Sequence, residues 1–241
     1  PKVMGILNLT PDSFYDGGKY QSIKLAIKRC DNMLSQGADI IDIGAVSSRP
    51  ESKIISEKEE FNRLIPILTV LVKEFNSAIF SVDTYRSQIA KASIDKGAAI
   101  INDISGGKFD PKMLPLVGKN NTVYIAMHMQ GSPHNMQKNP SYKDVTSELL
   151  SFFLDKIKSC QLNKIHNVII DPGFGFGKEI NQNFEILKNL EIFQELNVPI
   201  LVGFSRKSMI YKSLKIQPIE ALNGTSVLNT VALLKKANIL R

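Results

Sequence analysis

Residues 3–18, VMGILNLTPDSFYDGG, contain the pattern that the rest of the chain repeats. The apolar run from Val3 to Leu7 has the length and aliphatic composition of a buried strand, and it stops at Asn8. The residues after Asn8 are mostly turn formers and oxygen ligands. We therefore expect a core strand that leads into a loop with an amide and two carboxylates, Asp12 and Asp16, at its C-terminal end.

The same order of short apolar strand, polar loop and amphipathic helix recurs along the chain. The residues at the predicted strand ends are Asn8, Gly44, Asp83, Asn102, His128, Asp171, Ser205 and Arg241. Their average spacing of about 33 residues suits one strand–helix unit. Strict alternation implies parallel strands with right-handed crossovers. We predict an α/β fold, a single (β/α)8 TIM-barrel domain over residues 1–241, with the final helix apparently absent after the eighth strand.

Composition indicates an ordinary globular protein, with 43% apolar and 22% charged residues. No window of about 18 apolar residues exists, so no membrane span is expected. The first residues lack a charged and then apolar leader, which favours a cytoplasmic location. Cys30 and Cys160 lie in apolar helical patterns without metal-ligand spacing, so we expect reduced core residues.

The formal net charge of +7 does not by itself predict a nucleic-acid partner. The lysines are scattered over predicted helices, and no basic segment alternates with aromatic residues. A general attraction for small anionic ligands fits the charge equally well. We therefore expect small-molecule substrates, with no nucleic acid and no membrane as partners.

Polar residues at the C-terminal ends of barrel strands converge on one face, where active sites lie. The predicted convergent set is Asn8, Ser48, Arg49, Asp83, Asn102, Asp171, Lys207 and Arg241. Its two carboxylates, Asp83 and Asp171, and the amide of Asn102 suit a flat heterocycle with a guanidine-like edge, and Lys207 can bond a ring carbonyl or nitrogen. Arg49, Arg206 and Arg241 suit phosphate or carboxylate. Asn8 can give an oxygen to Mg²⁺ that bridges substrate phosphates.

Other catalytic templates do not match. The glycines of Gly173–Lys178 form GxGxGK, which is neither a phosphate-binding P-loop nor a dinucleotide fingerprint. The chain has no G-x-S-x-G nucleophile elbow. Only His128 of the three histidines ends a predicted strand, and neither His134 nor His166 pairs with it at zinc-ligand spacing.

Seven ordered blocks resemble one family. MGILNLTPDSFYDGG, SSRP, SVDTYR, INDISGG, MHMQGSP, DPGFGFGK and GFSRKS are similar to the motifs of the dihydropteroate synthases and cover essentially the whole chain. The resemblance implies a transferase of folate biosynthesis. It would condense (7,8-dihydropterin-6-yl)methyl diphosphate with 4-aminobenzoate and release pyrophosphate. Members of the family are cytoplasmic homodimers that need Mg²⁺ and are targets of sulfonamides.

The resemblance also assigns roles by position. It implies Asn8 as the metal-linked residue, and Arg241 as the residue that holds the diphosphate. The residues that bind the pterin would be Asp83, Asn102, Asp171 and Lys207. The residues that frame the aminobenzoate would be Ser48, Arg49, Pro50, Phe176 and Ser208. Of these residues, we expect Asp83, Asp171, Lys207 and Arg241 to act in catalysis.

The chain departs from the family pattern at two places. Val46, Ser48 and Glu51 replace a glutamate, a threonine and a glycine in the second loop, so packing against the aminobenzoate loosens and the loop stiffens. The histidine expected two residues after Arg241 is absent, which puts diphosphate binding in doubt unless the chain is truncated there. The role of Asp12, as a metal contact or as a turn cap, stays open.

Two other functions compete with the synthase. A pterin-dependent corrinoid methyltransferase shares the barrel and an Asp–Asn–Asp grip, but it needs no diphosphate site. A non-catalytic pterin-binding barrel would explain the changes in the second loop. The mechanism expected for the synthase is a dissociative substitution at the pterin methylene.

Overall fold

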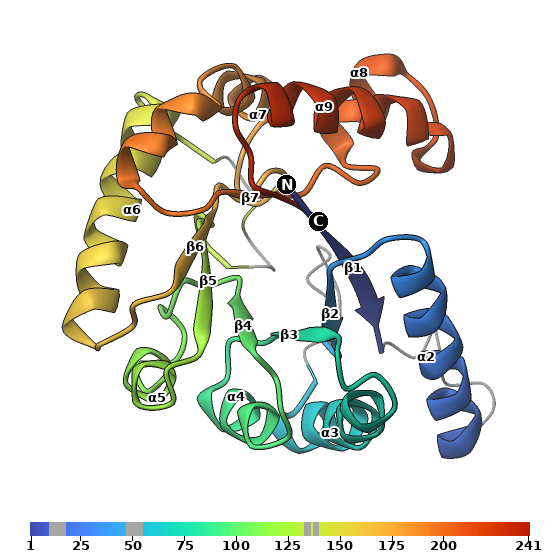
Figure 1. The fold of residues 1–241 in the computed structure, drawn as a ribbon. Coiled ribbons are helices and arrows are strands. Elements are labelled where there is room, and N and C mark those ends of the chain that lie inside the picture. Colours follow the sequence, from blue (N-terminus) through green and yellow to red (C-terminus); the bar gives the residue numbers. More distant parts are fainter. Residues whose placement is uncertain (10–17, 47–54, 133–135, 137–139) are drawn as a thin grey trace.

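The computed structural model describes residues 1–9, 18–46, 55–132, 136 and 140–241. Eight strands lie in these ranges, namely β1 (Lys2–Asn8), β2 (Ile40–Gly44), β3 (Ile79–Asp83), β4 (Ile100–Asp103), β5 (Val123–Met127), β6 (Val168–Asp171), β7 (Leu201–Val202) and β8 (Ile239–Leu240). They form one parallel sheet in the order β6-β5-β4-β3-β2-β1-β8-β7. The two ends of the sheet also meet, because Ile170 pairs with Ile200 and its N–H donates to the Pro199 carbonyl at 3.0 Å. The predicted (β/α)8 barrel is confirmed (Figure 1).

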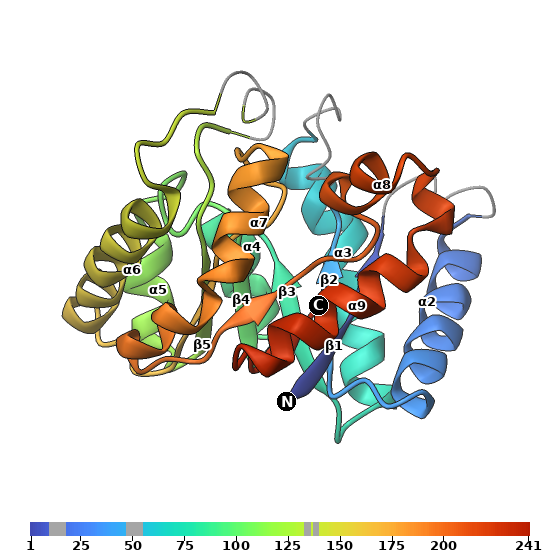
Figure 2. The same ribbon diagram turned by 90° about the horizontal axis from the view of Figure 1, so that it is seen from above.

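Helices alternate with the strands and form the outer layer of the barrel (Figure 1). They are α2 (Gly18–Ser35), α3 (Glu57–Glu74), α4 (Ser87–Ile94), α5 (Met113–Lys119), α6 (Val145–Leu162), α7 (Ile180–Lys188), α8 (Ser208–Leu214) and α9 (Leu222–Leu234), with the 3₁₀ helices η1 (Leu190–Leu196) and η2 (Pro218–Glu220). In the side view of Figure 2, α2 and α6 flank the barrel on opposite sides. Strand β8 pairs with β1 and ends one residue before Arg241, so the two ends of the chain lie close together.

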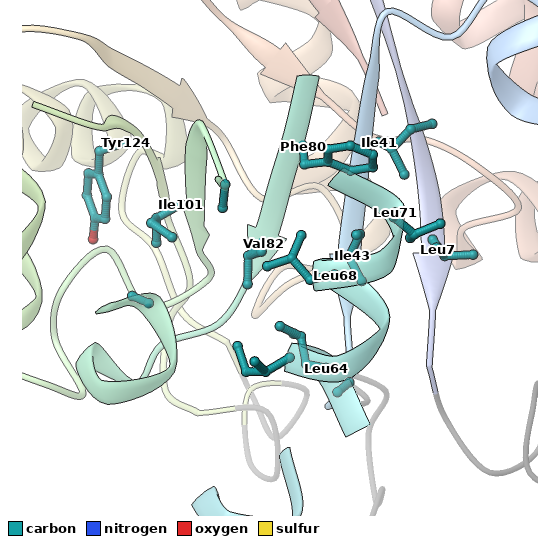
Figure 3. Close-up of a cluster of buried hydrophobic side chains, with 14 of the residues drawn as sticks. Leu7, Ile41, Ile43, Leu64, Leu68, Leu71, Phe80, Val82, Ile101 and Tyr124 are labelled. Carbon is teal, nitrogen blue, oxygen red and sulfur yellow. The ribbon is translucent and has the colours of Figure 1, made fainter. Parts of the chain in front are cut away.

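Alternation along each strand divides the core into two layers. Residues such as Ile41 and Ile43 of β2 point outward and pack against the helices. Helix α3 meets them with Leu64, Leu68 and Leu71, which follow the three- and four-residue spacing of one helix face (Figure 3). All five of these side chains are buried. This packing holds β2 against α3. It thereby fixes the inward-facing residue of β2 that lies between Ile41 and Ile43.

Buried thiols also belong to the layer between strands and helices. Cys30 of α2 and Cys160 of α6 are both buried and free, as the sequence predicts. Burial raises the pKa of each thiol to about 11, so both stay protonated at neutral pH. Among the helices that the structure describes, none is both long and apolar enough to cross a membrane.

Candidate active site

The inside of the barrel is lined by a second, separate cluster. Its buried members come from seven strands and are Met4, Ile40, Ile100, Ile125, Ile169, Leu201 and Ile239. Side chains from strands all round the ring can touch one another only inside it. Because side chains alternate along a strand, the residues two positions further along also face inward. Asp42, Asn102, Asp171 and Arg241 occupy such positions, so four polar residues lie in the layer above an apolar floor.

Arg241 follows β8 and links the end of that strand to β2 and β3. Its Nε donates to Oδ2 of Asp42 at 2.7 Å, and its Nη2 donates to Oδ2 of Asp83 at 2.9 Å. Asn102 Nδ2 donates to the same Asp42 oxygen at 2.9 Å. Burial would lower the pKa of Arg241, but the carboxylates of Asp42 and Asp83 raise it above the ordinary value. The guanidinium is therefore a fixed cation beside two carboxylates.

Asp83 titrates far from the usual range of a carboxyl group. Burial raises its pKa to about 7 against the opposing effect of Arg241, and the carboxylates of Asp42, Glu60 and Asp103 add to the rise. Ionisation of Asp83 is therefore costlier than that of an exposed carboxyl group, and Arg241 is the group that favours it. A ligand that carries positive charge would favour the ionised form.

Asp171 and Lys207 form the opposite part of the site. Asp171 Oδ1 accepts the N–H of Gly173 at 2.8 Å, and burial raises the pKa of its carboxyl group. Lys207 Nζ donates to the carbonyl of Phe174 and lies 4.7 Å from the ring centroid of Phe176. Burial lowers the pKa of Lys207 to about 8, although Asp171 opposes this shift. Lys207, which precedes α8, thus reaches across to the carboxylate of Asp171 and to the aromatic ring of Phe176 in the loop after β6.

The loop after β6 is held in place by a buried lysine. Lys178 Nζ donates to the carbonyls of Phe176 at 3.0 Å, Gly173 at 3.1 Å and His128 at 3.3 Å. It also lies 3.1 Å from His128 Nδ1. Burial and the nearby Lys178 lower the pKa of His128 to about 3, so the ring is neutral and Nδ1 acts as an acceptor. The GxGxGK segment is therefore a tethered loop that supports Asp171 and Phe176.

The remaining predicted residues lie at the mouth of the barrel or outside the described ranges. Asn8 ends β1 and is exposed, while Ser208 begins α8 and is partly exposed. Ser48, Arg49 and Pro50 of the second loop lie outside the described residues, as do Asp12 and the rest of the loop after β1. The structure thus brings together Asp83, Asn102, Asp171, Lys207 and Arg241.

Asp42 is a site residue that the sequence argument missed. It lies inside the strand, whereas the search for polar residues concentrated on strand ends. The signal was available, because an aspartate two residues after an inward-facing isoleucine in IIDIG must also face inward. Asp42 is completely buried and contacts two of the predicted residues.

A metal ion at this site would take most of its ligands from the bound substrate rather than from the protein. The described residues contain no cluster of three or more His, Cys, Asp or Glu side chains arranged to hold an ion. Asn8 offers one amide oxygen at an exposed position on the inward face of β1. This donor fits Mg²⁺, which keeps several waters and takes other ligands from substrate phosphates.

A family model described as "Pterin binding enzyme" matches residues 4–241. The dihydropteroate synthase of Escherichia coli strain K12 is 41% identical over 243 residues, which cover 100% of this chain and 86% of that protein. The solved structure of the Yersinia pestis dihydropteroate synthase with a sulfonamide drug complex superposes with a TM-score of 0.93 at 39% identity, covering 100% of this chain and 88% of the other. The Xanthomonas albilineans dihydropteroate synthase in complex with 7,8-dihydropteroate gives a TM-score of 0.88 at 33% identity, covering 100% and 87%.

Proposed function

This chain belongs to the family of pterin-binding enzymes and carries out the dihydropteroate synthase reaction, and we propose from that premise which residues perform it. The reaction of folate biosynthesis joins (7,8-dihydropterin-6-yl)methyl diphosphate to 4-aminobenzoate. The observation that supports our assignment most is that Asp42, Asp83, Asn102 and Asp171 come from four strands and gather at one end of the barrel with Arg241, which follows β8.

The pterin ring is recognised by hydrogen bonds of matching polarity. The amino group and the neighbouring ring N–H form a guanidine-like edge with two donors, which suits the carboxylate of Asp171. Lys207 lies beside Phe176 and donates to a ring carbonyl or nitrogen. Asn102 supplies an amide on the opposite side of the site. Phe176 and Ser208, together with Ser48, Arg49 and Pro50, frame the aminobenzoate.

Bond cleavage at the pterin methylene precedes bond formation. The C–O bond breaks, its electron pair leaves with the diphosphate, and the electron-rich dihydropterin delocalises the positive charge. Asp83 and Asp171 stabilise this cation electrostatically. The amine lone pair of aminobenzoate then forms the C–N bond, and the nitrogen releases its proton to water.

The side chains of the site support a reaction without a covalent enzyme intermediate. Among the described residues, the hydrogen-bond partner of the His128 ring is Lys178 Nζ, and no Ser, Thr or Cys side chain pairs with the ring as a nucleophile would. We expect intact-protein mass spectrometry of samples quenched during turnover to show an unmodified chain. A pterin adduct on any side chain would contradict this mechanism.

The leaving diphosphate needs more positive charge than the strand ends provide. Three carboxylates, Asp42, Asp83 and Asp171, face the cations Arg241 and Lys207. Nη1 of Arg241 has no hydrogen-bond partner among the described residues and can bind a diphosphate oxygen. Mg²⁺ held by Asn8 and the diphosphate would supply the remaining charge neutralisation.

We further propose that the enzyme is a cytoplasmic homodimer. Free, buried Cys30 and Cys160 suit a reducing compartment. Helix α9 supports a self-association face, because Val227 and Leu234 lie seven residues apart on one side of the helix and are 59% and 75% exposed. We expect sedimentation equilibrium to give twice the chain mass and Val227→Glu to weaken the association. A wild-type protein that is monomeric at all concentrations would contradict the proposal.

A further inference from the structure

Asp42 is a completely buried carboxylate in the middle of β2. Its neighbours Ile41 and Ile43 face the helices, while Asp42 faces the inside of the barrel. A buried carboxylate is costly unless it is paired and hydrogen-bonded. Its partners should therefore show why the barrel contains it.

A single oxygen of Asp42 has two partners from distant parts of the chain. Oδ2 accepts Arg241 Nε at 2.7 Å and Asn102 Nδ2 at 2.9 Å. Both partners belong to the predicted substrate set. The second oxygen, Oδ1, is buried and has no hydrogen-bond partner among the described residues. Asp42 thus joins β2 to β4 and to Arg241, the residue after β8.

The contact with Asn102 decides which way its amide faces. An ionised carboxylate only accepts hydrogen bonds, so Asn102 must turn its amide nitrogen toward Asp42. The amide then has one N–H and its carbonyl oxygen left for a ligand. That pair matches a heterocycle edge in which a ring nitrogen lies beside a ring N–H.

The contact between Asp42 and Arg241 keeps the carboxylate of Asp83 available to the ligand. Arg241 uses Nε for Asp42 and Nη2 for Asp83. A guanidinium prefers to meet one carboxylate with two parallel N–H groups. Without the charge on Asp42, Arg241 can turn fully onto Asp83 and cover the oxygens that would otherwise face the ligand.

We propose that Asp42 is a positioning residue for the pterin, because it fixes the hydrogen-bonding face of Asn102 and holds Arg241 away from full pairing with Asp83. The identity of the ligand rests on the proposed function. The geometric claim concerns only Asp42, Asn102 and Arg241. It is therefore tested by binding as well as by turnover.

The test compares Asp42→Asn with a matched control, Ser81→Ala. Ser81 pairs in register with Asp42 on the neighbouring strand, and its buried hydroxyl has no hydrogen-bond partner among the described residues. Ser81→Ala removes a buried hydroxyl from the strand beside Asp42. Asp42→Asn keeps an acceptor oxygen but removes the negative charge that Asn102 and Arg241 share. Calorimetry measures binding of 6-hydroxymethylpterin, and steady-state kinetics give KM for each substrate.

For Asp42→Asn we expect the dissociation constant of 6-hydroxymethylpterin to rise roughly 10-fold or more, since a neutral amide neither holds the charge of Arg241 nor forces Asn102 to present its N–H. KM for the pterin substrate should rise with it, while KM for 4-aminobenzoate and the Ser81→Ala values stay unchanged. Unchanged pterin affinity in folded Asp42→Asn would overturn the proposal, as would an equal loss in Ser81→Ala. Pterin binding without turnover in the wild type would instead count against the proposed function and leave the binding comparison valid.

Discussion

Asp171→Asn is expected to reduce kcat/KM for the pterin substrate roughly 10²- to 10⁴-fold, the cost of losing one side of a buried charged hydrogen-bond pair. The substitution keeps the size of the side chain and can keep the bond from the Gly173 N–H. It replaces one acceptor oxygen with an amide donor, which then faces the donor edge of the pterin. Stopped assays at saturating 4-aminobenzoate measure the effect.

The same variant should change the pH profile. The charge of Asp171 raises the pKa of Lys207, which burial lowers to about 8 overall. Without that charge the pKa of Lys207 falls further, so the lysine loses its proton at a lower pH. The alkaline limb of kcat/KM should therefore move to lower pH in Asp171→Asn.

The control for this prediction is Asp155→Asn on the exposed side of α6, which makes the same change of side chain on the surface. It should match the wild type in both rate and pH profile. Near-wild-type activity of Asp171→Asn would show that the site is assigned wrongly.

Gly173→Ala should be the most destabilising small substitution in the loop after β6. A Cβ at this glycine would lie 2.1 Å from the carbonyl oxygen of His128, and the backbone φ of +69° is unfavourable for alanine. Backbone atoms cannot move aside as a flexible side chain can. We expect a loss of roughly 3–5 kcal/mol in the free energy of unfolding, from left-handed strain together with overpacking.

Gly37→Ala is the matched control, since Gly37 has a φ of +97° and nothing within 4 Å of its added Cβ. It should lose about 1 kcal/mol, from strain alone. Urea denaturation measures both variants. Equal losses in the free energy of unfolding would mean that the close approach of Gly173 to His128 does not hold the loop. That result would contradict the role of the loop in supporting Asp171 and Phe176.

Much of the site could be predicted from sequence because a barrel converts a one-dimensional pattern into a common face. Asp83 and Asp171 are the last residues of β3 and β6, and Asn102 is the last but one of β4, so parallel strands place all three at the same end of the barrel. The eighth strand was predicted from two residues, Ile239 and Leu240, and the structure confirms it.

Residues within strands were harder to predict, because their roles depend on partners far away in the sequence. Asp42 contacts Arg241, which is 199 positions away, and no local pattern indicates that pair. Lys178 was seen as part of a GxGxGK segment that matches no phosphate-binding motif. Its contact with the carbonyl of His128 becomes visible only when β5 and β6 lie side by side.

The sequence of the second loop is compatible with two functions, a synthase and a non-catalytic pterin-binding barrel. Val46, Ser48 and Glu51 differ from the usual pattern, and Ser48 and Glu51 lie outside the described residues. A non-catalytic barrel would tolerate these changes and still bind pterin through Asp171 and Asn102. A synthase needs the loop to frame the aminobenzoate as well. Turnover, rather than pterin binding, separates the two.

The most direct test is pyrophosphate release by the full-length protein. We predict release only when (7,8-dihydropterin-6-yl)methyl diphosphate, 4-aminobenzoate and Mg²⁺ are all present, with one dihydropteroate formed for each pyrophosphate. Tight pterin binding without any release under these conditions would contradict the account.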